Sequence, residues 1–254
     1  MQSQTTNTIL MIRPVNFRYN LETAESNKFQ SQEAIRLNEL ETQKAAEEEF
    51  DSMVEQLRRA GVNVLVYDDI AEPHTPDSVF PNNWVSFHYS GKVVLYPMMA
   101  TNRRAERRMD IIEDLQKKYH VDVLLDFSHF EKQDKFLEGT GSIVLDRMHR
   151  IAYACISPRT NEEVLKSWQN QMNGYQVVKF KANDKEGNAI YHTNVMMCIG
   201  HTFAVVCLDA ITDYDERLMV KESLERSRKN IIEISFEQMN SFAGNMLLVK
   251  KANG

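Results

Sequence analysis

Short apolar runs alternate with longer amphipathic stretches along most of the chain. In the longer stretches apolar residues recur every three or four positions, which predicts helices over about 31–60 and 103–119, and helices that begin near Thr160 and Asp213. The short runs predict strands over Thr8–Pro14, Val62–Tyr67, Trp84–Tyr89, Lys92–Pro97, Val121–Phe127, Ser142–Asp146, Ile151–Ser157, Gln176–Phe180, Val195–Ile199, Phe203–Asp209, Ile231–Ser235 and Met246–Lys250. This alternation is typical of an α/β fold.

Local signals mark the ends of three of these helices. Thr160 and Glu163 have the spacing of a capping box, and Asp213 with Glu216 predicts a second capped helix start. Gly61 follows the first helix, where glycine commonly ends a helix with a positive φ.

The residue before each of four predicted hairpins marks a repeat. These residues are Asn83, Gly141, Asn194 and Asn245, which are 58, 53 and 51 residues apart. Each unit holds a hairpin, a helix and a returning strand, and a period of this length indicates radial or stacked repeats. One unit is too small to bury its own apolar face, so neighbouring units must share a core. We therefore predict a single domain over residues 1–254.

The last unit stops after its first strand, Met246–Lys250. The residues from Lys251 to Gly254 stand where earlier units place the hairpin turn, and Asn-Gly is a strong turn signal. We expect the unit to be truncated, because an open repeat leaves an unpaired strand edge. The alternative is a degenerate repeat in which Met246–Lys250 is a terminal strand.

Composition and charge exclude several classes of protein. Hydrophobic residues make up 43% and charged residues 26%, close to a globular average, so a disordered chain is excluded. A net charge of −6 favours neither nucleic acid nor an anionic membrane as partner, and no apolar run could span a bilayer. The N-terminus MQSQTTNT lacks the apolar segment of a secretory signal. Three cysteines inside apolar runs are typical of reduced thiols, so we expect a cytoplasmic protein.

The segments that precede the hairpins carry the polar residues that could perform chemistry. In a radial repeat, equivalent positions of successive units converge on the axis. Asn83, Glu138, His192 and Asn194 would then face one another across a small cavity, and a His beside a carboxylate can act as an acid–base pair. Each residue alone is better explained by a structural role, as a polar turn residue or, for His192, as a strand-edge histidine. Their recurrence at one phase of the repeat favours a site.

Three of these segments, FPNNW, LEGTGS and YHTN, resemble those of the guanidine-modifying superfamily, also called the pentein or amidinotransferase superfamily. The closest resemblance is to its branch of citrulline-utilization hydrolases and related amidinotransferases, to which ILMIRPVNF and PMMATNRRAERR are also similar. The resemblance extends from about Thr8 to Lys250. It implies a five-bladed α/β propeller, here with an incomplete last unit, which agrees with the repeat.

The resemblance implies catalytic roles for Glu138 and His192. The family attacks a guanidine or ureido carbon with a Cys thiolate, while a His acts as acid and base and the Glu of the LEG segment holds substrate nitrogens. The family's nucleophile lies in a Gly-rich segment of the last unit, which would follow Gly254, so this chain alone is expected to be inactive. The chain's own cysteines lie within predicted strands as small buried residues: Cys155, Cys198 and Cys207.

Two amides distinguish the predicted site from that of arginine deiminases in the same superfamily. That branch has Asp where Asn83 and Asn194 stand. A guanidinium only donates hydrogen bonds and suits carboxylates, whereas a neutral ureido group also has a carbonyl acceptor and suits amides. Asp77, in the same loop as Asn83, either restores a negative charge as a substrate-binding residue or caps a turn. The resemblance thus implies a small amino acid as substrate, with citrulline favoured.

Other functions stay open at this stage. They are an arginine deiminase, an amidinotransferase in which an amine replaces water, and a non-catalytic propeller that binds a small amino acid or a protein. No cofactor is expected, and seven scattered His residues indicate no metal site. The oligomeric state is open, and a homo-oligomer is compatible with the prediction. The basic cluster of Arg103, Arg104, Arg107 and Arg108 is predicted to be a solvated helix face, the alternative being attraction of a carboxylate substrate.

Overall fold

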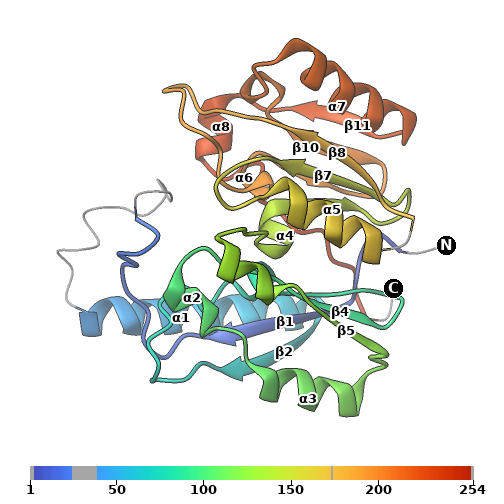
Figure 1. Cartoon of the computed structure of the whole chain (residues 1–254). Coiled ribbons are helices and arrows are strands. Elements are labelled where there is room, and N and C mark those ends of the chain that lie inside the picture. Colours follow the sequence, from blue (N-terminus) through green and yellow to red (C-terminus); the bar gives the residue numbers. More distant parts are fainter. Residues whose placement is uncertain (1–2, 25–38, 173, 253–254) are drawn as a thin grey trace.

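A computed structural model describes residues 3–24, 39–172 and 174–252, whose strands form four sheets (Figure 1). Three sheets share one pattern, in which the middle strand pairs antiparallel with its hairpin partner and parallel with the strand that returns after a helix. Their strands are β3 (Val85–Phe87), β4 (Lys92–Leu95) and β5 (Val123–Asp126); β6 (Ile143–Asp146), β7 (Ile151–Cys155) and β8 (Gln176–Phe180); and β9 (Met197–Ile199), β10 (Phe203–Val206) and β11 (Asn230–Glu233). The repeat predicted from the sequence is thus confirmed in three units.

The fourth sheet pairs β1 (Thr8–Arg13) in parallel with β2 (Asn63–Asp68). Helix α1 (Glu39–Arg59) connects them and buries Phe50 and Val54 against the sheet. Gly61 ends this helix at a φ of +87°, as predicted. Residues 31–38 of the predicted helix lie outside the described residues.

Of three predicted helices, one is divided in the structure, one begins one residue later than predicted, and one begins where it was predicted. The helix predicted over 103–119 divides into α2 (Thr101–Arg104) and α3 (Met109–Lys118), with Glu106 buried between them. The N-cap of α5 (Glu162–Gln171) is Asn161 and not Thr160, because the Asn161 side chain accepts from two free amides of the first turn. The N-cap of α7 (Tyr214–Arg226) is Asp213, as predicted.

The remaining helical segments are short. Single turns precede the first strand of each three-stranded sheet, and Figure 1 shows α4 and α6 in the middle of the molecule, away from α3 and α7. These segments are η2 (Pro81–Asn83), η3 (Ser128–Gln133), α4 (Gly139–Ser142), α6 (Thr193–Met196), η4 (Leu208–Ala210) and α8 (Phe236–Asn240).

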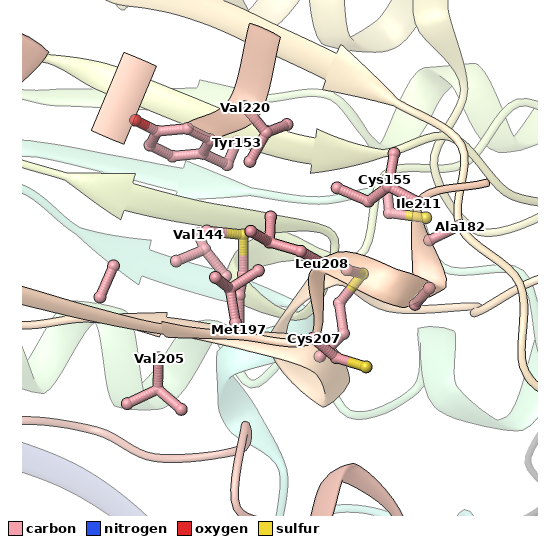
Figure 2. Packing of buried hydrophobic residues seen from close by; sticks show 14 of the residues in the cluster. Val144, Tyr153, Cys155, Ala182, Met197, Val205, Cys207, Leu208, Ile211 and Val220 are labelled. Carbon is pink, nitrogen blue, oxygen red and sulfur yellow. The ribbon is translucent and has the colours of Figure 1, made fainter. Parts of the chain in front are cut away.

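The largest apolar cluster joins the second and third repeat units. It packs β6–β8 against β9–β11 and the inner face of α7, and Figure 2 shows Tyr153, Met197 and Val220 among its buried side chains. Since the units share this core, the single-turn segments at their ends are held close together.

The chain after Asn245 does not form the predicted strand. Within Met246–Lys250 only Val249 makes a ladder contact, a parallel bridge to Thr6, and Lys250 N donates to Thr6 O at 2.9 Å. The described residues therefore form four sheets, and the count of five blades is not reached among them.

Candidate active site

One turn of helix brings the predicted catalytic residues together. Glu138 immediately precedes α4 and His192 immediately precedes α6, so both occupy the same position in successive repeat units. Helix α4 packs against both η2 and α6. Equivalent segments of three units thus converge, as the repeat predicted.

Glu138 and His192 form a buried hydrogen-bonded pair. His192 Nε2 and Glu138 Oε2 lie 2.7 Å apart, and the two residues are 6% and 0% exposed. Glu138 Oε1 accepts from the backbone N of Met99 at 3.0 Å, and Arg159 Nη1 lies 3.4 Å from Oε2. Both carboxylate oxygens are therefore held in place, and one of them holds the imidazole.

The surroundings fix the charge of each partner. Burial by itself raises the pKa of the Glu138 carboxyl, but the hydrogen bond from His192 and the positive charges of Arg159 and Arg103 outweigh it, and the pKa falls to about 2. Burial lowers the pKa of the His192 imidazole, with Arg159 and Arg103 acting in the same direction and Glu138 opposing them. At neutral pH the pair is a carboxylate beside a neutral imidazole.

This charge state assigns the imidazole tautomer. A carboxylate only accepts hydrogen bonds, so His192 Nε2 carries the proton and donates to Glu138. In a neutral ring the other nitrogen, Nδ1, then has no proton and is an acceptor. His192 therefore has the form of a general base.

Two glycines of the LEGTGS segment allow the units to approach this closely. Gly139 has a φ of +48°, and a Cβ there would lie 2.1 Å from the carbonyl oxygen of Asn82. A Cβ at Gly141 would lie 2.3 Å from Asn83 Nδ2 and 2.9 Å from His192 Nδ1. Real Cβ atoms essentially never come so near another heavy atom. Gly139 therefore requires glycine, because it faces backbone at a positive φ, and a Cβ at Gly141 would displace the side chains of Asn83 and His192.

Asn83 also lies beside Glu138, and its side chain is held by Arg103, which we predicted to be solvated. Asn83 Nδ2 donates to the carbonyl oxygen of Glu138 at 3.4 Å, and Asn83 Oδ1 accepts from Arg103 Nη1 at 2.8 Å. Arg103 is 2% exposed and pairs with buried Glu106 through two hydrogen bonds of 2.9 and 3.0 Å. The prediction of a solvated face is wrong for Arg103, because its charge is neutralised inside the protein.

Among the described residues, Asp77 is connected to the Glu138–His192 pair through Arg103. Its Oδ2 accepts from Asn20 Nδ2 at 2.7 Å and from Thr23 Oγ1 at 3.3 Å, and lies 3.8 Å from Arg103 Nε. Its side chain therefore ties the N-terminal segment to the site. Its carboxylate also lies near Arg103, and its two predicted roles, substrate binding and the capping of a turn, stay predictions.

Asn194 faces the last repeat unit. Its Nδ2 donates to Asn245 Oδ1 at 3.3 Å, which joins two of the residues that mark the repeat phase. Its own Oδ1 is buried without a hydrogen-bond partner among the described residues. The contacts of Asn194 are thus with the last unit, and its role in substrate binding stays a prediction.

Sequence reasoning missed Arg159 as a partner of the pair. Arg159 is 2% exposed and its guanidinium lies over the Tyr191 ring, 4.8 Å from the centroid. It follows the middle strand of the second sheet, as Met99 follows the middle strand of the first. A comparison of these two equivalent loops would have pointed to both of them as neighbours of Glu138.

The cysteines are buried as expected. Figure 2 shows Cys155 and Cys207 among apolar side chains of the largest cluster. Burial raises the pKa of Cys155 to about 12 and raises the pKa of Cys198 and Cys207 as well. None of the three is a thiolate at neutral pH.

Other features of the described residues lie away from this site. Cavities of about 520 and 220 Å³ border β1 and β2, and neither includes Glu138 or His192. Over residues 3–24, 39–172 and 174–252, no group of His, Cys, Asp and Glu is placed to hold a metal ion. Within the same ranges no helix has the length and apolar character to cross a bilayer.

Solved structures with the same fold include enzymes that act on arginine derivatives. ArgZ, an arginine dihydrolase from the ornithine-ammonia cycle in cyanobacteria, is 18% identical over 95% of this chain and 33% of its own, with a TM-score of 0.73. The N-terminal domain of ArgZ bound to substrate is 18% identical over 94% of this chain and 79% of its own, with a TM-score of 0.71. A dimethylarginine dimethylaminohydrolase is 17% identical over 98% of this chain and 82% of its own, with a TM-score of 0.61. The chain thus spans about a third of full-length ArgZ.

At these identities the likeness shows the fold alone. No curated protein matches the chain. A sequence model of the family described as "N,N dimethylarginine dimethylhydrolase, eukaryotic" matches residues 13–254. The superfamily to which this family and the structures belong is one of C–N hydrolases. Because the match covers almost all of its length, the chain belongs to the N,N dimethylarginine dimethylhydrolase family, within the guanidine-modifying (pentein) superfamily.

Proposed function

We propose that the protein is a hydrolase that acts on the guanidino or ureido carbon of a small amino acid, with Glu138 and His192 as its catalytic residues. The buried pair carries this proposal, since Glu138 Oε2 lies 2.7 Å from His192 Nε2. Glu138 holds the imidazole in the tautomer with an unprotonated Nδ1. That nitrogen can take a proton from a thiol or a water and return it to a leaving amine.

The reaction would run in two steps. A Cys thiolate attacks the carbon, and ammonia or an amine departs with a proton delivered by His192, which leaves a covalent thiouronium-like or carbamoyl-type intermediate. Water, deprotonated by the same imidazole, then attacks that carbon and the thiolate leaves. In this scheme Glu138 stays an anion throughout and stabilises the protonated His192.

The nucleophile of this scheme is none of the three cysteines. Cys155 donates to the carbonyl oxygen of Ile190 at 3.5 Å and has a pKa raised to about 12 by burial. The proposal therefore requires a thiol other than these three. Three free thiols also support the cytoplasmic location expected from the sequence.

The charge of the buried groups supports a neutral ureido substrate, citrulline. Asp77, Glu106 and Glu138 face Arg103 and Arg159. Glu106 pairs with Arg103 through two hydrogen bonds of 2.9 and 3.0 Å, so its negative charge is neutralised by that guanidinium. The carboxylates then barely exceed the guanidinium groups in number. This balance offers a cationic guanidinium little of the negative charge that would attract it.

The same proposal includes one domain over residues 1–254 with the five-bladed propeller of the superfamily. We assign the three complete sheets to three blades and β1 with β2 to a fourth, and the fifth blade rests on the fold of the superfamily. The family description favours one alternative substrate, a methylated arginine.

Binding and turnover test the proposal separately. Titration calorimetry of this chain with citrulline, arginine and dimethylarginine should show binding with citrulline tightest. In the protein that includes the nucleophile, His192→Ala should lower ammonia release from citrulline by roughly 10²–10⁴-fold while the fold persists. The exposed side chain of His129 provides the control variant His129→Ala, with unchanged turnover. If none of the three amino acids binds, or if His192→Ala keeps activity within about tenfold, the proposal is wrong.

A further inference from the structure

The hydroxyl of Thr193 joins the two helical turns that carry the Glu138–His192 pair. Thr193 begins α6 directly after His192 and is fully buried, and α4 and α6 pack against each other in the middle of the molecule (Figure 1). Thr193 Oγ1 lies 2.6 Å from the carbonyl oxygen of Ser142, the last residue of α4. It also lies 2.8 Å from the backbone N of Cys155, the last residue of β7. One side chain of the third repeat unit thus bonds to two places in the second.

The direction of both bonds is fixed. A backbone N–H only donates and a carbonyl oxygen only accepts, so the Thr193 hydroxyl accepts from Cys155 and gives its own proton to Ser142. Valine has nearly the shape of threonine but no hydroxyl. In its place, a buried donor and a buried acceptor would both lose their partner, which is the costly way to break a hydrogen bond.

Ser142 extends this connection to Glu138. Its Oγ accepts from the backbone N of Glu138 at 2.9 Å and donates to the carbonyl oxygen of Arg159 at 2.8 Å, and Ser142 is itself fully buried. Ser142 therefore holds the start of α4 through its side chain and the start of α6 through its carbonyl group. The connection runs beside the Glu138–His192 hydrogen bond and does not use it.

The hydrogen bond of the pair depends on how closely the two turns are held. His192 Nε2 and Glu138 Oε2 are 2.7 Å apart, and a further separation of about 1 Å would take them past hydrogen-bond distance. Glu138 selects the tautomer with a proton on Nε2 only while its carboxylate reaches that nitrogen. A group that fixes the spacing of α4 and α6 therefore also fixes the state of the imidazole.

We infer that Thr193 is a positioning residue, which holds His192 against Glu138 and so sets the tautomer of the imidazole. Its hydroxyl is the link from the turn that follows His192 to the turn that follows Glu138. The inference rests on the proposed function in one respect, since the unprotonated Nδ1 that results is the base of the proposed reaction.

The tautomer can be measured in this chain without a substrate. In NMR spectra of the imidazole nitrogens at neutral pH, wild-type His192 should carry its proton on Nε2, and that proton should exchange slowly with solvent. Thr193→Val should give a mixture of tautomers, with exchange faster by roughly tenfold or more because the hydrogen bond to a carboxylate is weakened. Thr193→Ser keeps the hydroxyl and should restore the wild-type signals.

Ser223→Ala is the matched control. The Ser223 hydroxyl on α7 lies 2.9 Å from the Tyr153 hydroxyl on β7, so this buried contact also joins the third unit to the second. Its loss should lower stability in urea to a similar extent and leave the His192 signals unchanged. If Thr193→Val does not fold, Thr193→Ala removes the same hydroxyl with a smaller side chain and provides the same measurement.

Turnover gives a second readout that a purely structural role would not move. In the protein that includes the nucleophile, Thr193→Val should lower kcat for citrulline by roughly 10–100-fold, while KM stays within about threefold of wild type. The two constants should separate in this way because the imidazole transfers protons and does not hold the substrate.

The outcomes separate this inference from the proposed function. A wild-type tautomer in Thr193→Val, signals of Thr193→Val in Thr193→Ser, or equal changes in Ser223→Ala would each overturn the role of Thr193 and leave the proposed function standing. A wild-type chain that binds none of citrulline, arginine and dimethylarginine would overturn the proposed function, while the tautomer measurement would still decide whether Thr193 holds the pair.

Discussion

A methyl group at Gly141 tests the geometry of the site most directly. In Gly141→Ala the new Cβ would lie 2.3 Å from Asn83 Nδ2 and 2.9 Å from His192 Nδ1, whereas ordinary van der Waals contact begins at 3.4 Å. The Asn83 amide would have to move by about 1 Å, and His192 by about half as much. Gly141 is not among the residues with positive φ, so the effect is steric and not due to backbone strain.

The substitution is expected to weaken both binding and stability. Overpacking of a filled interior costs about 1–3 kcal/mol, and alanine in a helical turn regains up to about 1 kcal/mol over glycine. The free energy of unfolding should therefore fall by about 0–3 kcal/mol. Misplacement of reacting groups by about 1 Å can lower catalysis about 100-fold, so we expect citrulline affinity and turnover to fall by at least tenfold.

Gly200→Ala is the matched control. Its Cβ would lie 2.5 Å from the Phe203 ring, a comparable clash within the third sheet and away from the pair. Urea unfolding should show similar destabilisation for both variants, while calorimetry with citrulline should show a loss only for Gly141→Ala. If Gly141→Ala binds citrulline within threefold of wild type, the positions of Asn83 and His192 do not control substrate binding.

Two further predictions concern stability. The pKa of Glu138 is about 2 in the fold against an ordinary 4.5, so its carboxylate stabilises the fold above pH 4.5 by about 3 kcal/mol, and this contribution is lost as the pH falls from 4.5 to 2. Urea titrations should show that Glu138→Gln flattens the stability profile over this interval, and an unchanged slope would contradict an ionised Glu138. Lys229 Nζ lies 3.1 Å from Asp146 Oδ2 with both side chains fully buried, so Lys229→Met should cost about 3–5 kcal/mol. Combining it with Asp146→Asn should restore part of that loss, and equal losses in the single and double variants would show that the two charges are not coupled.

The repeat and its strands could be predicted because they leave a signal in local sequence. Gln176–Phe180 forms a strand with the predicted bounds, and the hairpins around it begin within two residues of their predicted starts. The last two residues of the turn at Thr193–Met196 were instead predicted as the start of the strand Val195–Ile199. A segment of four residues is too short to show helical periodicity, so only the packing of α6 against α4 distinguishes it.

The convergence of Glu138 and His192 followed from the repeat phase, whereas their cationic neighbours did not. Arg103 stands in a run of arginines that is typical of a solvated face, and nothing local reveals that Glu106 would be buried with it. Arg159 lies in a loop with no motif of its own. Both arginines acquire their roles from residues more than fifteen positions away, Asn83 and Glu138, which only the fold brings near.

Glu138 and His192 occupy the same position in two consecutive repeat units, and this has a consequence for how such a protein can evolve. Glu138 and His192 each stand directly before a single helical turn in consecutive units. Identical copies of the unit would place two carboxylates or two imidazoles together, and neither combination gives a base held by an anion. A carboxylate beside an imidazole therefore depends on divergence between copies at this one position, while the strand order of each sheet is retained. Substitutions at the residues before α4 and α6 could exchange these two side chains for others without a change in the sheets.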